Sequence, residues 1–128
     1  MSKTIIHTDK APAAVGPYSQ AVATSTQKMV FLSGQIGFVP ATGELVTSSF
    51  EDQVRQAFAN MVAVIEAAGG DLNHVVKLTL YLTDLNNFSV ANEIMAGVVP
   101  QPFPARSTIG VASLPKGASF EVEAILAL

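Results

Sequence analysis

The stretch "SSFEDQVRQAFANMVAVIEAAGG" (residues 48–70) carries the clearest helix pattern in the chain, and "VVKLTLYLTDL" (residues 75–85) follows it closely with a strand pattern. Apolar residues recur at helical spacing in the first stretch. Ser48 and Glu51 have the spacing of a capping box, and two glycines mark the end. In the second stretch apolar and polar residues alternate, as in a strand that buries one face. A helix followed by such a strand predicts helices packed on a sheet.

The flanking sequence adds strands and a weaker helix. Alternation predicts strands at residues 28–38, 106–112 and 119–127, with Gly34 on the same face as Leu32. Residues 86–99 predict a second helix, which the following prolines end. The simplest fold is α+β, with one mixed sheet and two helices on one of its faces. We expect a single domain over residues 1–128.

The composition points to a partly covered surface. Of the 128 residues, 49% are apolar and 13% are charged, whereas about 25% charged residues is typical. This favours self-association over an ordinary monomer, which stays the alternative. The net charge is −3 and the basic residues are scattered, so nucleic acid is not favoured as a main ligand.

Residue types and patterns that the sequence lacks exclude further classes of protein. There is no cysteine, which excludes disulfides, thiol nucleophiles and cysteine–metal sites. His7 and His74 do not have metal-ligand spacing, so we expect no metal. No apolar run is long enough for a signal peptide core or a membrane span. We therefore expect a cytoplasmic protein without a membrane partner.

The segment "FPARSTIG" (residues 103–110) contains Arg106, one of only two arginines. A guanidinium presents a planar fork of donors that matches a carboxylate. A salt bridge to Glu121 or Glu123 is an equally weighted alternative. If the last two strands formed a hairpin, Arg106 would pair near Ile125, with Glu121 about 13 Å away. A ligand that touches both Arg106 and Glu121 therefore requires that these strands are not neighbours, or that the site is shared between subunits.

Three further polar or small residues lie at unusual positions. Asn92 is on the apolar side of the second predicted helix, where a buried amide needs a structural partner or a ligand. Tyr18 follows a Gly-Pro turn that fixes the position of its side chain. It is either a packing residue with an exposed hydroxyl or a site residue. Gly34 in the middle of a strand often marks the close approach of a ligand or another backbone.

Several segments together closely resemble the Rid family. They are "APAAVGPYSQAV", "FLSGQIG", "ATGEL", "VVKLTLYLTDLNNF" and "FPARSTIGVASLPKGASFEVEAIL", and they cover most of the chain. The sequence looks most like the RidA branch, the imine deaminases. The resemblance implies a chorismate-mutase-like (YjgF) fold, with one mixed sheet of about six strands and two helices on one face. It also implies a homotrimer with a central β-barrel and clefts between subunits.

The resemblance further implies an activity and its residues. The activity is hydrolysis of 2-iminobutanoate and 2-iminopropanoate, which pyridoxal-phosphate-dependent dehydratases form from threonine and serine. The products are 2-oxo acids and ammonia, and no cofactor or metal takes part. Arg106 would bind the substrate carboxylate and Glu121 would hold the water. The other residues that would line the cleft are Tyr18, Ser33, Gly34, Asn92 and Ser107.

Two other functions stay open at this point. One is an endoribonuclease or translation inhibitor. The other is a trimer that binds small molecules, or acts like a chaperone, without chemistry. The segment "ANEIMAGVV" (residues 91–99) departs from the family, because Met95, Val98 and Val99 stand where many relatives have aromatic residues. This leaves the cleft wall and the substrate range open.

Overall fold

The computed structural model describes residues 3–26 and 28–128, and within them it has the expected order of strands and helices. Short 3-10 turns at Leu72–His74, Leu85–Asn87 and Pro115–Gly117 connect some of these elements. None of the helices in the described part of the chain combines the length and apolar character needed to cross a membrane. The elements are β1 (Thr4–Ile6), β2 (Ala21–Ala23), β3 (Met29–Gln35), α1 (Phe50–Ala67), β4 (Val75–Leu82), α2 (Phe88–Val98), β5 (Ala105–Gly110) and β6 (Phe120–Ala127).

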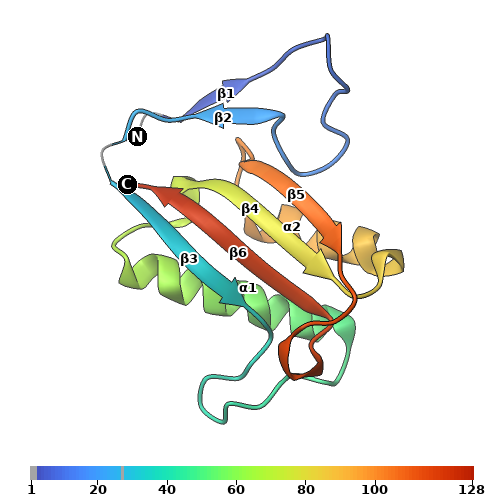
Figure 1. Cartoon of the computed structure of the whole chain (residues 1–128). Helices are drawn as coiled ribbons and strands as arrows, with labels where there is room; N and C mark the ends of the chain where they lie inside the picture. The colour runs from blue at the N-terminus through green and yellow to red at the C-terminus, as the bar shows by residue number, and fades with distance from the viewer. Residues whose placement is uncertain (1–2, 27) are drawn as a thin grey trace.

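The main sheet is mixed and has the strand order β3-β6-β4-β5 (Figure 1). β6 pairs antiparallel with both β3 and β4, whereas β4 and β5 are parallel. The α+β class and the mixed sheet are confirmed, but a single sheet of about six strands is wrong in detail. The strands divide into this sheet of four and a separate β1–β2 pair. The segment just before β2 reaches the main sheet through a bridge between Ser19 and Ala105.

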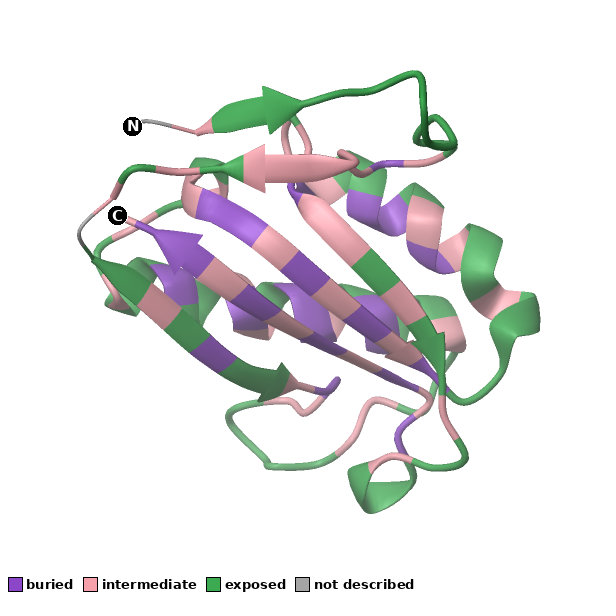
Figure 2. Cartoon of the chain, turned by 45° about the horizontal axis from the view of Figure 1, so that its top comes forward, coloured by how far each residue is buried: buried purple, intermediate pink, exposed green. Residues whose placement is uncertain are grey.

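Both helices cover the same face of the main sheet. Buried and partly buried residues alternate along β4 and β6, as the bands in Figure 2 show. The buried side chains meet α1 and α2, and the rings of Phe58 and Phe120 pack with centroids 5.7 Å apart. The opposite face carries no helix, and Phe31 and Ile109 on it are 72% and 43% exposed.

The long helix begins slightly later than its sequence pattern predicts. Ser49 is the N-cap, and its hydroxyl accepts a hydrogen bond from Asp52 N at 3.0 Å. The expected Ser48–Glu51 capping box is therefore wrong, and Ser48 instead donates to the Asp52 carboxylate at 2.8 Å. Gly69 has a φ of +87° and ends the helix as expected.

A bulge in β3 changes the face on which Gly34 lies. The pairing of β3 with β6 shifts register between Leu32 and Gln35. Leu32 is buried under the helices, whereas a Cβ on Gly34 would overlap the Glu121 carboxylate on the other face. The expectation that Gly34 shares a face with Leu32 is therefore wrong, because the bulge breaks the period of two.

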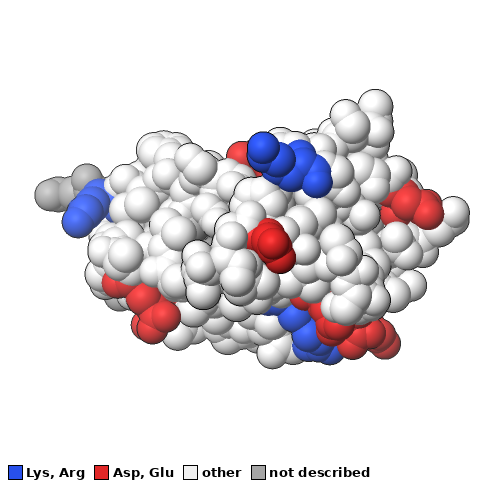
Figure 3. Space-filling view, turned by 90° about the horizontal axis from the view of Figure 1, so that it is seen from below, with Lys and Arg blue, Asp and Glu red and all other residues white. Residues whose placement is uncertain are grey.

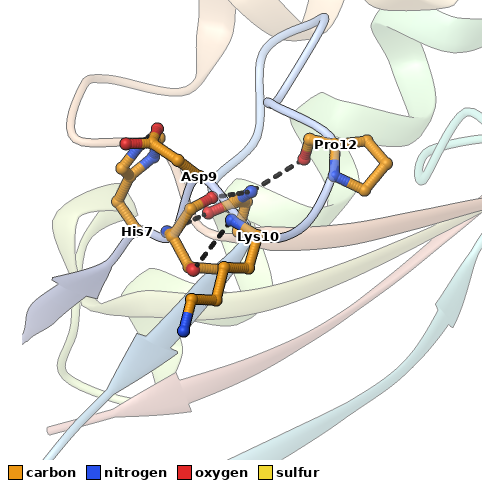
Figure 4. Close-up of polar contacts among 6 residues, drawn as sticks. His7, Asp9, Lys10 and Pro12 are labelled. Carbon is orange, nitrogen blue, oxygen red and sulfur yellow. Dashed lines mark hydrogen bonds and ion pairs between the residues drawn. The ribbon is translucent and has the colours of Figure 1, made fainter.

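The side chain of Gln20 holds the loop between β1 and β2, and Figure 4 shows the polar contacts of this loop around His7, Asp9, Lys10 and Pro12. Gln20 Oε1 accepts from Thr8 N at 2.8 Å, and its Nε2 donates to the carbonyl oxygens of Thr8 and Pro12 at 3.1 and 2.7 Å. Nearby, the His7 ring and the Asp9 carboxylate are 3.0 Å apart. These contacts tie the loop back to the start of β2 and so to Tyr18, which lies two residues before Gln20.

Candidate functional site

Arg106 lies in a cavity of about 270 Å³ at the edge of the sheet beside α2. Its partner across the β4–β5 ladder is Leu78, which is buried under the helices, so Arg106 points to the helix side. We call this hollow the Arg106 cavity. It is lined by Val15, Tyr18, Phe88, Asn92, Arg106 and Thr108.

The guanidinium of Arg106 is oriented by α2 and by two aromatic rings. Its Nη1 donates to Asn92 Oδ1 at 2.5 Å and lies 3.7 Å from Met95 Sδ. Its Cζ is 4.9 Å from the ring centroid of Tyr18 and 5.5 Å from that of Phe88. Ring faces attract cations, so these contacts hold the fork in a fixed direction while Asn92 binds one of its nitrogens.

Arg106 has no carboxylate partner in the described part of the chain. The ion pairs formed there are His7–Asp9, Arg55–Glu51 and His74–Asp71. The alternative of a salt bridge from Arg106 to Glu121 or Glu123 is therefore wrong. Burial lowers the pKa of Arg106, with a partial offset from Tyr18, but a guanidinium stays charged at neutral pH. A partly buried cation without an anion is suited to bind one.

Tyr18 reaches the cavity because the chain before β2 is anchored to β5. Ser19 N donates to Pro104 O at 2.9 Å, and Tyr18 N donates to Gly16 O at 2.8 Å within the expected turn. The Tyr18 hydroxyl accepts from Val15 N at 3.3 Å. The structure thus brings together three of the residues that the sequence predicted for the cleft, Tyr18, Asn92 and Arg106.

Three lining residues, Val15, Phe88 and Thr108, were not predicted as site residues, and two of them lie at informative spacings. Thr108 lies two positions after Arg106 on the same strand and so shares its face. Its Oγ1 is buried and has no hydrogen-bond partner among the described residues. Phe88 lies four positions before Asn92 on α2, one helical turn away. Both spacings were available in the sequence, but neither residue type suggests a site without the arginine beside it.

Glu121 belongs to a second cluster, on the sheet face without helices, which we call the Glu121 face. Its carboxylate lies over Gly34, the glycine that the sequence had marked as a place of close approach. Ser33, the residue before Gly34, is exposed. Partial burial and the neighbouring charge of Glu123 both raise the pKa of Glu121. Tyr81 also belongs to this cluster, and its hydroxyl donates to Glu123 Oε1 at 2.6 Å.

Ser107 is also on the sheet face without helices. It pairs with Thr79 across the ladder, and Lys77 Nζ donates to its hydroxyl at 3.4 Å. Its side chain therefore lies outside the Arg106 cavity within one chain, unlike that of Thr108.

Arg106 and Glu121 point to opposite faces of the same sheet. β4 lies between β5 and β6, so the last two strands are not a hairpin. Arg106 aligns with Leu78, and Glu121 aligns with Tyr81. Two strand spacings and three residues along the strand separate their Cα atoms by about 14 Å. One chain therefore does not present Arg106 and Glu121 to one small ligand.

The described residues contain no group of three or more His, Asp or Glu side chains that could hold a metal ion. The Arg106 cavity offers a guanidinium, an amide, a hydroxyl and aromatic rings. This set suits a small anion with an apolar part.

A family model described as Endoribonuclease L-PSP matches residues 8–128. The chain belongs to this family. Within it, the named relatives place the chain in the RidA type of the Rid family. The chain is 47% identical to "2-iminobutanoate/2-iminopropanoate deaminase" of Dermatophagoides farinae, over 98% of this chain and 97% of that one. It is 44% identical to the Homo sapiens protein of the same name, over 96% of this chain and 88% of that one.

Solved structures of the Rid family have the same fold. RidA from the Antarctic bacterium Psychrobacter is 50% identical, with a TM-score of 0.76 over 98% of this chain and 99% of that one. A Rid protein from Yersinia pestis, YyfB, is 26% identical, with a TM-score of 0.87 over the whole of both chains. The expected Rid-family fold and the membership in the family are therefore confirmed.

Proposed function

We propose that this protein hydrolyses 2-iminobutanoate and 2-iminopropanoate to the 2-oxo acids and ammonia. The observation that carries the proposal is Arg106, a partly buried guanidinium without an anion in a small cavity with aromatic walls. Relatives that match nearly the whole chain bear the name of this activity. Arg106 would bind the substrate carboxylate through its free donors, while Asn92 keeps the fork oriented.

Glu121 is the proposed base. A water held by its carboxylate attacks C2 of the imine, and Glu121 takes one proton from that water. That proton passes to the nitrogen and gives a carbinolamine. The proton of its hydroxyl group then moves to the nitrogen through Glu121, the C–N bond breaks, and ammonia leaves while C2 becomes the 2-oxo carbon. Imino acids also hydrolyse in water alone, so orientation of water and imine accounts for most of the catalysis. Serine hydroxyls at Ser33 and Ser107 would contribute polar contacts from the same sheet face as Glu121.

The separation of Arg106 and Glu121 within one chain supports a site shared between subunits. We propose a homotrimer in which the sheet faces without helices meet around a central barrel, and Arg106 of one subunit faces Glu121 of the next. The exposed apolar side chains on that face, including Phe31 and Ile109, favour such contact. The low charge content of the chain agrees with it.

An endoribonuclease activity is less favoured. On the face shown in Figure 3, Lys and Arg lie apart from one another between wide uncharged areas and acidic side chains. Binding along a phosphate backbone draws on neighbouring cations. The family description names such an activity, but the Arg106 cavity fits one small carboxylate rather than a nucleic-acid strand.

The direct test is an imine trap. An amino-acid oxidase generates the imine in the presence of semicarbazide, and the protein is scored by how far it suppresses semicarbazone formation. Wild type should suppress it, and Arg106→Ala should lose this by about 100-fold or more, because positioning of the reactant is lost. Arg55→Ala, which removes the other arginine at an exposed helix position, is the matched control and should be fully active. Equal suppression by Arg106→Ala would contradict the role of Arg106, and no suppression by wild type would contradict the proposed function.

A further inference from the structure

Tyr81 and Glu123 form a hydrogen bond next to Glu121 that the proposed mechanism does not use. In the ladder Tyr81 on β4 stands opposite Glu121 on β6. Its hydroxyl nevertheless reaches along the strands to Glu123 Oε1, at 2.6 Å. The tyrosine thus lies across from one carboxylate and binds the other.

We propose that Tyr81 is a positioning residue for Glu121, which acts by holding the carboxylate of Glu123 and offsetting part of its charge. This deepens the proposed function and rests on it for one point, the role of Glu121 as the base. Tyr81 itself does not touch the substrate in this proposal.

The surroundings of Glu121 favour this arrangement. On the β3 side Gly34 has no side chain, and a Cβ there would overlap the Glu121 carboxylate. Along β6 the neighbour on the same face is Glu123, with Cα atoms about 7 Å away at strand rise. On the β4 side stands the ring of Tyr81. The Glu121 carboxylate therefore lies between the backbone of Gly34 and the side of Tyr81, with Glu123 as its charged neighbour along β6.

Within one chain, Tyr81 is the group on this face that moderates the two carboxylates, and in the proposed trimer Arg106 of the next subunit would face Glu121 equally in every variant compared below. β3 presents no ionisable side chain to Glu121, because Ser33 and Gly34 are the residues beside it. Lys77 on β4 is a cation on this face, and it donates to the Ser107 hydroxyl at the β5 side. Partial burial and, after it, the charge of Glu123 raise the pKa of Glu121. The hydroxyl of Tyr81 directs a proton at Glu123, which reduces that repulsion.

Opposite effects of two substitutions follow from this arrangement. Glu123→Gln removes the negative charge, so the pKa of Glu121 should fall. Tyr81→Phe keeps the ring but removes the donor, so Glu123 acts with its full charge and the pKa of Glu121 should rise. A hydrogen bond that only stabilises the fold predicts lower stability in both variants and no such opposite shifts.

The experiment is a pH titration of the Glu121 side-chain carboxyl by ¹³C NMR, together with the pH dependence of kcat/KM for imine hydrolysis. The samples are wild type, Glu123→Gln, Tyr81→Phe and, as a control, Glu44→Gln, which removes an exposed carboxylate in the turn between β3 and α1. The Glu121 titration should move to lower pH in Glu123→Gln, to higher pH in Tyr81→Phe, and stay unchanged in the control. Shifts in the same direction, or no shift in Tyr81→Phe, would overturn the proposal.

The activity profile separates this proposal from the proposed function. If Glu121 is the base, the acid limb of kcat/KM should follow the NMR titration in each variant. If the NMR shifts occur as expected while the acid limb stays in place, the positioning by Tyr81 stands and the role of Glu121 in the reaction fails.

Discussion

The Arg106 cavity and the Glu121 face differ in how complete they are within one chain. Around Arg106, the β1–β2 loop, α2 and β5 contribute an amide, aromatic rings and a hydroxyl to one open hollow. Around Glu121, strands alone contribute a carboxylate pair and a tyrosine on a face that no helix covers. Under the proposed mechanism, a single chain presents the carboxylate-binding side at Arg106 but not the base beside it.

The difference also concerns electrostatics. Arg106 is held by neutral groups that leave its charge unpaired. Glu121 stands beside a like charge, and its pKa is raised. A carboxylate with a raised pKa is a better proton acceptor, whereas an unpaired guanidinium is a better anion binder. The two regions are therefore suited to different parts of one reaction.

Among substitutions that affect only the Glu121 face, Gly34→Ala should have the largest effect on turnover. The added Cβ would overlap the Glu121 carboxylate and displace it. Turnover should fall by about 100-fold, within the usual contribution of a positioned base, while 2-oxobutanoate binding at Arg106 persists. Steady-state kinetics and calorimetric binding measure the two effects. The matched control is Gly97→Ala, where the added Cβ meets no atom within 4 Å and activity should be unchanged. Normal turnover in Gly34→Ala would contradict the role of the close contact.

The next effect concerns the Arg106 side. Asn92→Asp would place a carboxylate against Arg106 Nη1, where the amide oxygen now lies at 2.5 Å. The resulting ion pair should compete with the substrate and weaken 2-oxobutanoate binding about tenfold or more, the scale of a charged hydrogen bond. Asn92→Ala, which removes the orientation without adding a charge, should weaken it less. Equal affinities of Asn92→Asp and wild type would show that Arg106 does not bind the ligand carboxylate.

A smaller effect is expected at Thr108. Its buried hydroxyl has no partner among the described residues, so Thr108→Val should not lower the melting temperature. If the hydroxyl contacts the ligand, the same variant should bind 2-oxobutanoate about two- to tenfold less tightly, the scale of one neutral hydrogen bond. Thr108→Ser should restore the affinity. A lower melting temperature with unchanged binding would instead assign the hydroxyl to the fold.

The smallest effect is the pH dependence of stability at Glu121. The pKa of this carboxyl is higher in the folded protein than its ordinary value, so its ionisation disfavours folding. This cost is absent below the unfolded pKa and complete above the folded one. Glu121→Gln should therefore raise the melting temperature slightly near pH 7 and leave it unchanged near pH 3, as differential scanning calorimetry can measure. A rise of equal size at both pH values would exclude the ionisation as its cause.

Much of the fold follows from local pattern, and much of the site does not. Periodicity is local, so the helices and the strands of the main sheet are predictable from it. The prediction of the sheet face for Gly34 was wrong because the bulge depends on the pairing of β3 with β6, which no local pattern encodes. Tyr18, Asn92 and Arg106 were found by residue type, and the structure brings them together. Val15, Phe88 and Thr108 were missed because only the packed structure shows that they line the Arg106 cavity.

The central claim, that Arg106 of one copy acts with Glu121 of another, is tested most directly by mixing two inactive variants. Arg106→Ala and Glu121→Gln are unfolded together, refolded at equal amounts and assayed for imine hydrolysis. In a closed ring of randomly mixed subunits, each interface takes Arg106 from one subunit and Glu121 from its neighbour. A quarter of the interfaces then combine both intact residues, so about a quarter of the wild-type activity should return. Each variant refolded alone should stay at its own low level. Recovery near a quarter supports a site shared between subunits, and activity no greater than the average of the two variants would contradict it.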